Sequence, residues 1–535
     1  MWDKLVQGPS ARWILGGVLA ILAGWLYRDV PEQRLTRLDD SIFIEEQYAF
    51  NREDDSYAKA LTRGVFVPKG DSYYRPLLIW SFVADAHQHQ LRLKGYLKTN
   101  VLLHVLSCVL IFLALGSLGF GTGNAFALAL VFVVHPALSQ AVAWIPGRND
   151  SLLAAGTFAA LIGMERWLST GRWGWLILQA VMGLATLLTK ETGVVVLPAL
   201  SVLVWACRGP LGTRFRWAAL GIGWLMSLTL WYVGRAQAGT LSTGLEPSNL
   251  AALWVERLPM LVQYLGKMFL PFNLCVFPIQ DDTTLQWGVL SLLGLGILLW
   301  FAPPSTRRAW TGGLLFWFLL LVPAMVVPKG LNDQVFEHRL YVPALGLLVA
   351  VGSTDLFRLK WTLPYRAALL GVVAFFYAQI NLNHREVFRD ELVFWKNAVD
   401  HAPSSAYAHV MYAIRCNTVQ GLPRPGMEVA RTYVNRAYAL DSNEKYVNHY
   451  MGLVALEDKR YAEAERYFGR EIRITALADS YFNRARAFFE LGRKREAAGM
   501  LEAFLQLRPG DPSATNNLKL LYQELGDTAS LRKLP

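Results

Sequence analysis

Residues 99–147 read TNVLLHVLSCVLIFLALGSLGFGTGNAFALALVFVVHPALSQAVAWIPG and contain no Asp, Glu, Lys or Arg. One membrane-spanning helix needs about 20 apolar residues, so this stretch alone is long enough for two. The whole chain of 535 residues is 53% hydrophobic and 17% charged, whereas soluble domains contain about 25% charged residues. This composition excludes a soluble enzyme, a disordered regulator and a fibrous protein, and it predicts a polytopic membrane protein.

Further apolar runs recur throughout the first 383 residues. We predict eleven membrane spans, near residues 13–27, 99–117, 124–142, 151–164, 173–189, 193–207, 217–234, 284–302, 310–327, 340–354 and 367–382. We expect the first to be retained, because Trp25, Leu26 and Tyr27 stand where signal-peptide cleavage needs small residues. The predicted fold class is all-α, with a membrane domain over 1–383 and a soluble domain over 384–535.

Basic residues in the short loops predict the orientation of these spans, because Lys and Arg are enriched on the cytoplasmic side. With a cytoplasmic N-terminus, the basic residues of alternate loops all face the cytoplasm: Arg166, Arg172, Arg208, Arg214, Arg216, Arg307, Arg308, Arg358, Lys360 and Arg366. A crossing by residues 254–277 would reverse this pattern, so we predict that they form an amphipathic or re-entrant segment on the outer side. The first loop (28–95, with interfacial helices) and the tail then lie on the outer side as well.

The net charge of +11 belongs mainly to the membrane domain, since residues 1–383 contain 30 basic and 22 acidic residues and residues 384–535 contain 22 and 19. Loops that face an anionic leaflet account for such an excess. Nucleic-acid binding would instead require a basic face on a soluble domain, and we expect none. The four cysteines are isolated, without CxxC spacing, and they indicate neither a zinc site nor a disulfide framework.

The tail from about residue 404 to 526 contains paired amphipathic helices. Two second helices of such pairs, starting at Tyr461 and Lys494, follow short polar turns at Asp458 and Gly492, which are 34 residues apart, the tetratricopeptide period. We predict about three repeats and a terminal helix from about Ser513 to Leu525. Such arrays usually bind peptides or proteins on a concave surface; the alternative is a structural cap on the membrane domain.

A small set of polar residues remains at the ends of the spans, and on the predicted topology they all lie at the outer interface. Polar groups at membrane depth indicate a functional site, and clustered cations suit a phosphate, which Arg binds with two hydrogen bonds and Lys as a point charge. Asn100 and His104 are four residues apart and therefore share one helix face. The set consists of Asp39, Asp40, Tyr73, Tyr74, Arg75, Asn100, His104, Arg148, Asn149, Asp150, Lys190, Glu191, Glu337, His338 and Arg339.

The order of the motifs that carry these residues resembles one family. The motifs are DD at 39–40, YYRPL from Tyr73, LKTNVLLH from Leu97, HPALSQAVAWIPGRND from His135, LLTKETG from Leu187 and EHRLYVPALG from Glu337, followed by the repeats. This order is similar to that of the transmembrane and tetratricopeptide repeat-containing (TMTC) O-mannosyltransferases, which belong to the GT-C class. The tail is shorter than in animal members and ends LRKLP, without an ER-retention signal. We therefore expect a prokaryotic relative in the bacterial inner membrane, with its site and repeats in the periplasm, or in the lumen if the chain is eukaryotic.

The resemblance implies a polyprenyl-phosphate sugar donor and a Ser or Thr hydroxyl of a protein as acceptor, bound through the repeat domain. It implies a catalytic base in the first outer loop, Asp39 or Asp40. We expect inverting transfer, with the donor phosphate bound by Arg339 first, then Lys190, and with His338 and Arg148 as helpers. The orienting residues would be Glu191, Glu337, Asp150, Arg75, Tyr74, Asn100, His104 and Tyr341. A divalent metal that bridges Asp39 or Asp40 and the phosphate is an alternative without a closed ligand set, and we predict no metal.

Three other functions are compatible with the sequence. The same fold could glycosylate a glycan or a lipid. A non-enzymatic assembly factor would use only the repeats, so that changes at Asp40 and Arg339 would leave its function intact. A transporter would place its polar residues at the membrane midplane, whereas these lie at one interface.

Overall fold

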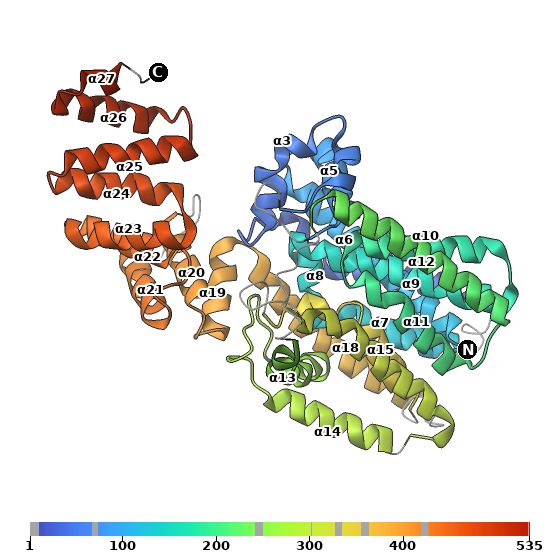
Figure 1. Ribbon diagram of the computed structural model, residues 1–535. Helices are drawn as coiled ribbons and strands as arrows, with labels where there is room; N and C mark the ends of the chain where they lie inside the picture. The colour runs from blue at the N-terminus through green and yellow to red at the C-terminus, as the bar shows by residue number, and fades with distance from the viewer. Residues whose placement is uncertain are drawn as a thin grey trace. The chain divides into compact units, whose positions relative to one another are not determined.

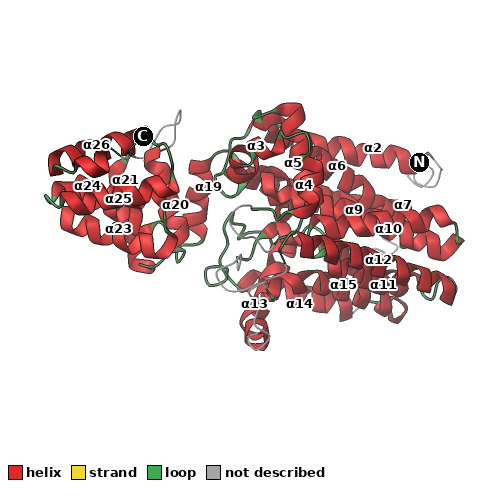
Figure 2. Ribbon diagram, turned by 45° about the horizontal axis from the view of Figure 1, so that its top comes forward, coloured by secondary structure: helices red, strands yellow, loops and turns green. Residues whose placement is uncertain are grey.

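The computed structural model describes residues 10–66, 73–240, 250–300, 302–326, 334–354, 363–418, 426–532 and 534. In these residues the chain forms helices and loops, with no β-strand (Figure 2). The predicted all-α class is therefore confirmed. The chain divides into two compact units, Met1–Phe394 and Trp395–Pro535, whereas the sequence predicts that the tail begins at residue 384. Arg358 and Lys360, used above to orient the spans, lie outside the described residues.

Unit 1 is a bundle of apolar helices with several short helices at the ends of the long ones (Figure 1). Its longer helices are α2 (Ala11–Leu26), α5 (Pro76–His89), α6 (Leu93–Ser117), α7 (Thr122–Val134), α9 (Arg148–Thr170), α10 (Trp173–Thr189), α11 (Gly193–Arg208), α12 (Arg214–Gln237), α13 (Leu250–Phe269), α14 (Gln286–Trp300), α15 (Arg307–Met325), α16 (Ala344–Gly352) and α18 (Leu363–Arg385). The shorter ones include η2 (Ile42–Glu46), α3 (Tyr48–Asn51), α4 (Ser56–Lys59), α8 (Gln140–Ala143) and η8 (Glu337–Leu340). Figure 1 shows the long helices α9 to α12 running side by side, and α9 packs against both α6 and α10.

Four of the described helical stretches are long and apolar enough to cross a membrane: Ala11–Glu32, Leu93–Ser117, Arg214–Gln237 and Pro304–Met325. A fifth candidate is the bent pair Thr122–Val134 and Pro136–Ala143. Three shorter apolar helices, α10, α11 and α14, also fall on predicted spans. The chain is therefore a membrane protein with four or five candidate spans by length and composition, and eleven spans stays a prediction.

The break between α7 and α8 lies at His135 and Pro136, where the chain bends by 60°. Proline cannot donate the backbone hydrogen bond that would continue α7. The His135 ring replaces part of the lost bonding, because its Nδ1 accepts from the amide of Ala137 at 3.3 Å and its Nε2 lies 2.8 Å from the carbonyl oxygen of Met268 in α13. The break therefore brings the residues that follow α7 next to the end of α13.

Two glycines let α13 and α14 approach each other closely. A Cβ added to Gly266 would lie 2.7 Å from the backbone nitrogen of Gly288, and one added to Gly288 would overlap the carbonyl oxygen of Val262. Small residues permit this backbone approach in membrane helices. The position of α13, which carries several residues of the site, therefore depends on these two glycines.

Replacing Gly288 by Ala is expected to lower the thermal unfolding temperature of the protein in detergent. Overpacking of this kind costs about 1–3 kcal/mol of folding free energy. Gly294→Ala in the same helix is the matched control, since a Cβ at Gly294 meets nothing within 4 Å. Equal unfolding temperatures for the two variants would contradict the close α13–α14 packing.

Unit 2 consists of successive helix pairs (Figure 1). They are α20 (Ala406–Thr418) with α21 (Met427–Leu440), α22 (Val447–Glu457) with α23 (Tyr461–Thr475), and α24 (Ala478–Glu490) with α25 (Lys494–Leu507), followed by α26 (Pro512–Leu525) and the short α27 (Thr528–Leu531). The turns inside the second and third pairs have the same left-handed geometry, at Lys459 (φ 59°) and Gly492 (φ 75°). Ala464 and Ala498 are buried between helices. The assignment of these pairs as tetratricopeptide repeats stays a prediction.

Candidate active site

Unit 1 contains a cluster of buried and partly buried charges around Asp150. Asp150 lies in the first turn of α9, and Lys190 follows the last residue of α10, so the packing of α9 against α10 brings them together. The Lys190 ammonium donates to both carboxylate oxygens of Asp150, at 2.7 and 2.8 Å. The pairing of residues 40 positions apart in the sequence is the centre of the candidate site.

A second ion pair joins the segment between α2 and α5 to the same group of charges. Arg75, at the start of α5, donates from Nε and Nη2 to Oε2 of Glu191, at 3.0 and 2.7 Å. The backbone amide of Tyr74 donates to the other oxygen of Glu191 at 3.3 Å. Glu191 follows Lys190 directly, so the motifs YYRPL and LLTKETG meet here.

The segment η8 brings a third contribution from late in the chain. The amide and Nδ1 of His338 lie 3.0 and 3.2 Å from Oε1 of Gln140 in α8, and its Nε2 lies 4.0 Å from Asp150. Arg339 interacts electrostatically with Asp150 and with Tyr264 of α13. Its guanidinium also donates to the carbonyl oxygen of Gln334 at 2.6 Å. Charges from four separate segments therefore meet around Asp150.

Burial and mutual repulsion control the protonation of this cluster. Burial lowers the pKa of His338 well below its usual value, and the charges of Lys190, Arg339 and Arg75 lower it further. Burial also lowers the pKa of Lys190, although the attraction of Asp150 opposes the shift. His338 is thus a neutral imidazole at neutral pH. Arg75, Lys190 and Arg339 are the cations that can face an anion here.

In the segment between α2 and α5, the two adjacent carboxylates Asp39 and Asp40 lie in different environments. Asp40 is 1% exposed, and its oxygens accept from the Thr36 amide at 2.5 Å, the Thr36 hydroxyl at 2.8 Å, the Arg37 amide at 2.9 Å and the Ser41 amide at 2.8 Å. Asp39 is half-buried, and its own φ is +63°. A non-glycine residue in this conformation is strained and persists only where its surroundings hold it. Asp40 therefore holds the turn on which Asp39 stands.

This turn is also tied to the helical body. The indole of Trp144, between α8 and α9, donates to the carbonyl oxygen of Leu38 at 2.9 Å. The same indole lies against the ring of His338, with a distance of 5.4 Å between ring centres. Trp144 therefore connects the loop of Asp39 with the segment that carries His338 and Arg339.

We expect activity to fall as the pH falls through about 6, because burial raises the pKa of Asp40 to about 6 against the lowering effect of its backbone hydrogen bonds. Protonation turns one accepting oxygen of Asp40 into a hydroxyl, which changes the hydrogen bonds that position Asp39. The free energy of unfolding responds to pH in the opposite direction from activity. Since the folded chain binds this proton more tightly than the unfolded chain, the contribution of Asp40 to stability is lost as the pH rises through about 6.

The measurement is a pH–rate profile of the wild type beside Asp40→Asn. The variant is expected to be less active and to lack the wild-type acid limb, because Asn presents an amide to the same donors at every pH. An unchanged acid limb in Asp40→Asn would show that a different group titrates.

Arg148 occupies a separate, internal site. Its guanidinium is fully buried and pairs with Asp85 of α5 at 2.7 Å. It also donates to Oδ1 of Asn100 at 2.8 Å and to the carbonyl oxygen of Tyr96 at 2.7 Å. The amide of Asn100 in turn donates to the carbonyl oxygens of residues 142, 144 and 145. This network joins α5, α6 and α9.

His104 and Tyr341 also lie inside the bundle. Their Nδ1 and hydroxyl are 2.6 Å apart, and the His104 ring packs edge-on against Tyr27 of α2. Both residues are buried. The contact joins α6 to the segment between η8 and α16.

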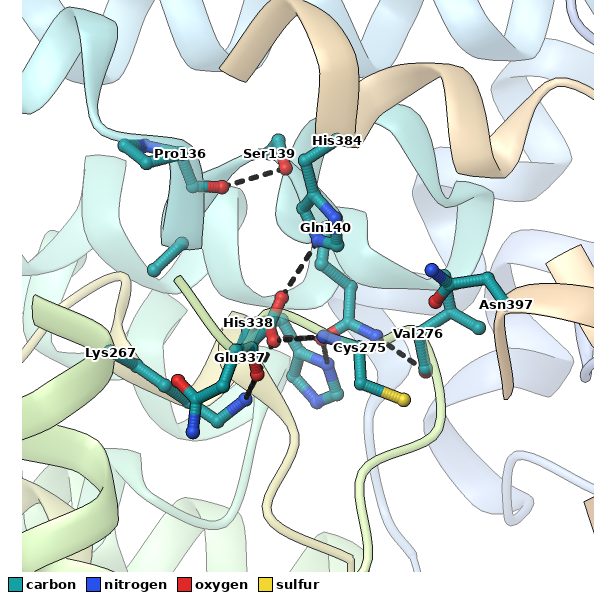
Figure 3. Close-up of polar contacts among 12 residues, drawn as sticks. Pro136, Ser139, Gln140, Lys267, Cys275, Val276, Glu337, His338, His384 and Asn397 are labelled. Atoms are coloured by element: carbon teal, nitrogen blue, oxygen red, sulfur yellow. Dashed lines mark hydrogen bonds and ion pairs between the residues drawn. The ribbon is translucent and has the colours of Figure 1, made fainter. Parts of the chain in front are cut away.

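Sequence reasoning missed Asp85, Tyr264, Lys267 and His384. Lys267 lies 2.8 Å from Glu337, and His384 lies 2.9 Å from the same carboxylate (Figure 3). A charged residue inside an apolar segment was the available signal for Lys267, because such a residue needs a buried partner. In the described part of the chain, no group of three or more His, Cys, Asp or Glu residues is arranged to hold a metal ion.

No protein-family model matches the chain. Over 124 residues, 23% of this chain, it is 34% identical to "Protein O-mannosyl-transferase Tmtc1" of Drosophila melanogaster. Over 134 residues it is 33% identical to the TMTC1 protein of Mus musculus and 31% identical to that of Homo sapiens. The match spans only 14% of the length of the fly and mouse proteins and 15% of the human one.

Among solved structures, the chain is similar to ArnT from Cupriavidus metallidurans, both bound to undecaprenyl phosphate and in the apo state. The TM-score is 0.40 in both cases, with 14% and 15% identity, over 92% of this chain and 80% of the other. The resemblance to the TMTC O-mannosyltransferases is thus confirmed as similarity over about a quarter of the chain.

Proposed function

We propose that this chain is an integral-membrane glycosyltransferase of the GT-C class. It takes a sugar from a polyprenyl-phosphate donor and transfers it to a Ser or Thr hydroxyl of a protein on the outer face of the membrane. The observation that carries this proposal is the convergence of Arg75, Lys190 and Arg339 around Asp150 in a unit of apolar helices. Cations grouped in this way suit a phosphate whose lipid tail lies in the bilayer.

The chemistry follows from the charges of the two partners. The acceptor hydroxyl has a pKa far above working pH, so a positioned carboxylate must take its proton as the hydroxyl oxygen attacks the anomeric carbon. We assign this role to Asp39, because the carboxylate of Asp40 is engaged by four donors of its own turn. The new bond forms between the hydroxyl oxygen and the anomeric carbon, and the bond from that carbon to the phosphate oxygen breaks.

The leaving polyprenyl phosphate carries its bonding electrons away as an anion and needs cations rather than a general acid. Arg339 is our first choice for this stabilisation and Lys190 the second, with Arg75 beside them. Asp150 and Glu191 hold Lys190 and Arg75 in place through their ion pairs. A single displacement of this kind inverts the anomeric configuration.

The acceptor is proposed to be a polypeptide bound by the helix pairs of unit 2. Paired-helix arrays offer extended surfaces for peptides, and the partial similarity to proteins named O-mannosyl-transferases agrees with protein as acceptor and mannose as the sugar. We expect the site and the helix pairs to face the periplasm of a bacterial inner membrane.

The test uses membranes containing the full chain, a polyprenyl-phosphate mannose donor and candidate secreted proteins, with mass spectrometry of the products. Hexose on Ser or Thr, absent with Asp39→Asn, is the expected result. Transfer to a glycan or lipid but not to protein would keep the enzyme and replace the acceptor. Transfer by Asp39→Asn at the wild-type rate would contradict the catalytic assignment.

A further inference from the structure

Three ionisable side chains meet in the interior of unit 1, at the segment that carries Arg339. Oε1 of Glu337 accepts from the Lys267 ammonium at 2.8 Å and from the Cys275 amide at 2.7 Å, and its Oε2 lies 2.9 Å from Nε2 of His384 (Figure 3). Lys267 and Glu337 are fully buried, and His384 is 7% exposed. We call Lys267, Glu337 and His384 the buried triad.

The members of the buried triad come from three elements that are far apart in the sequence. Lys267 lies near the end of α13, Glu337 begins η8, and His384 lies in the last turn of α18. Burial alone would raise the pKa of Glu337, but Lys267 and His384 outweigh it and lower the pKa to about 2. The carboxylate is therefore ionised and anchors the first residue of η8 to two helices.

The next residue of η8 is fixed from the other side. Oε1 of Gln140 accepts from the His338 amide at 3.0 Å, while Nε2 of Gln140 donates to the carbonyl oxygen of Val276 at 3.1 Å (Figure 3). Arg339 is the third residue of this short segment. With Glu337 and His338 both held, the backbone has little freedom left at the position from which the Arg339 side chain starts.

Apolar packing alone would not require ions at this place. Replacing a buried ion pair by apolar residues of similar volume is often neutral or stabilising, so such a pair is weak evidence of a stabilising role. An ion pair does, however, fix direction, because its energy depends on distance and its atoms must meet. Glu337, the central residue of the triad, directly precedes His338 and Arg339 in the sequence. The ion pairs of Glu337 are therefore suited to position these two residues.

We infer that Lys267 and His384 are positioning residues of the donor-phosphate site, which act through Glu337 to set where Arg339 stands. The inference rests on the proposed function, since it assumes that Arg339 binds the donor phosphate. Lys267 in α13 and His384 in α18 lie outside the sequence motifs, and the inference gives both helices a part in positioning Arg339. A purely structural triad would affect stability without affecting the affinity for the donor.

The experiment measures binding of polyprenyl phosphate to the full chain in nanodiscs, together with thermal unfolding. Lys267→Gln and His384→Gln are each expected to weaken binding by about 10-fold, the lower end of what loss of an outer-shell partner does at metal sites. Lys267→Arg, which keeps the charge, is expected to recover part of the affinity. Glu165→Gln is the matched control, because Glu165 is also a buried carboxylate in an ion pair, with Arg208 at 3.3 Å. Glu165 belongs neither to the charged cluster around Asp150 nor to the buried triad.

A double variant tests whether the members act as one unit. If Lys267 acts through Glu337, then Lys267→Gln combined with Glu337→Gln will weaken binding no more than Glu337→Gln alone. If Lys267→Gln does not fold, His384→Gln alone answers the question. Wild-type affinity in folded His384→Gln, or equal losses in Glu165→Gln, would overturn the inference.

The failure of the proposed function has a different signature. If the wild type and Arg339→Ala bound polyprenyl phosphate equally, Arg339 would not bind the donor phosphate. That result would contradict both the proposed donor site and the inference that rests on it. Weak binding by Arg339→Ala but full binding by folded Lys267→Gln and His384→Gln would retain the donor site and overturn only the role of the buried triad.

Discussion

Replacing Asp39 by Asn is expected to reduce kcat by about 10²–10⁴-fold, the usual contribution of a general base. The amide of Asn cannot accept the proton of the acceptor hydroxyl, so the attacking oxygen would have to release it to water. The proposed role of Asp39 is to accept the proton of the acceptor hydroxyl and not to bind the donor phosphate, so the affinity for polyprenyl phosphate should stay close to that of the wild type. The measurement is a single-turnover rate at saturating donor, with donor binding determined separately.

The control for this variant is Asp54→Asn, in the same segment between α2 and α5, because Asp54 is exposed to solvent. We expect it to retain wild-type turnover. A large loss in Asp54→Asn would mean that the loop responds to any change of charge. A small effect of Asp39→Asn together with a large pH-independent loss in Asp40→Asn would transfer the role of the base to Asp40.

Replacing Arg339 by Ala is expected to lower kcat/KM for the donor by about 10²–10³-fold, as the loss of one preorganised donor to a developing negative charge does in other enzymes. The charge of the leaving phosphate grows as its bond to the sugar breaks, so the guanidinium contributes most in the transition state. Arg339→Lys keeps a point charge but not the planar fork, and we expect partial recovery.

The effect should be specific to the donor. KM for the acceptor is expected to change little, and Arg307→Ala, an exposed cation at the start of α15, should behave like the wild type. If Arg339→Ala raised KM for donor and acceptor equally, the residue would support the fold of the site rather than the phosphate. Steady-state kinetics with each substrate varied in turn separate these outcomes.

Residues 99–147 and the other apolar runs suffice to predict an all-α membrane protein, because hydrophobicity over about 20 residues is a local property of the chain. The paired helices of unit 2 are visible in the sequence for the same reason, because amphipathic periodicity is also local, whereas their assignment as tetratricopeptide repeats stays a prediction. The motifs also identify most of the charged cluster, since Arg75, Asp150, Lys190, Glu191 and Arg339 are conspicuous as polar residues beside apolar segments.

What the tertiary structure decided is which of these residues pair with which. Arg148 was grouped with the phosphate-binding cations, but the packing of α5 against α6 and α9 gives it Asp85 as a partner. Asp39 and Asp40 are equivalent in the sequence, and only the turn geometry separates a carboxylate with four donors from its neighbour. The buried triad joins positions 267, 337 and 384. Periodicity describes one helix at a time, whereas an ion pair depends on distances between helices, which exist only once the chain has packed.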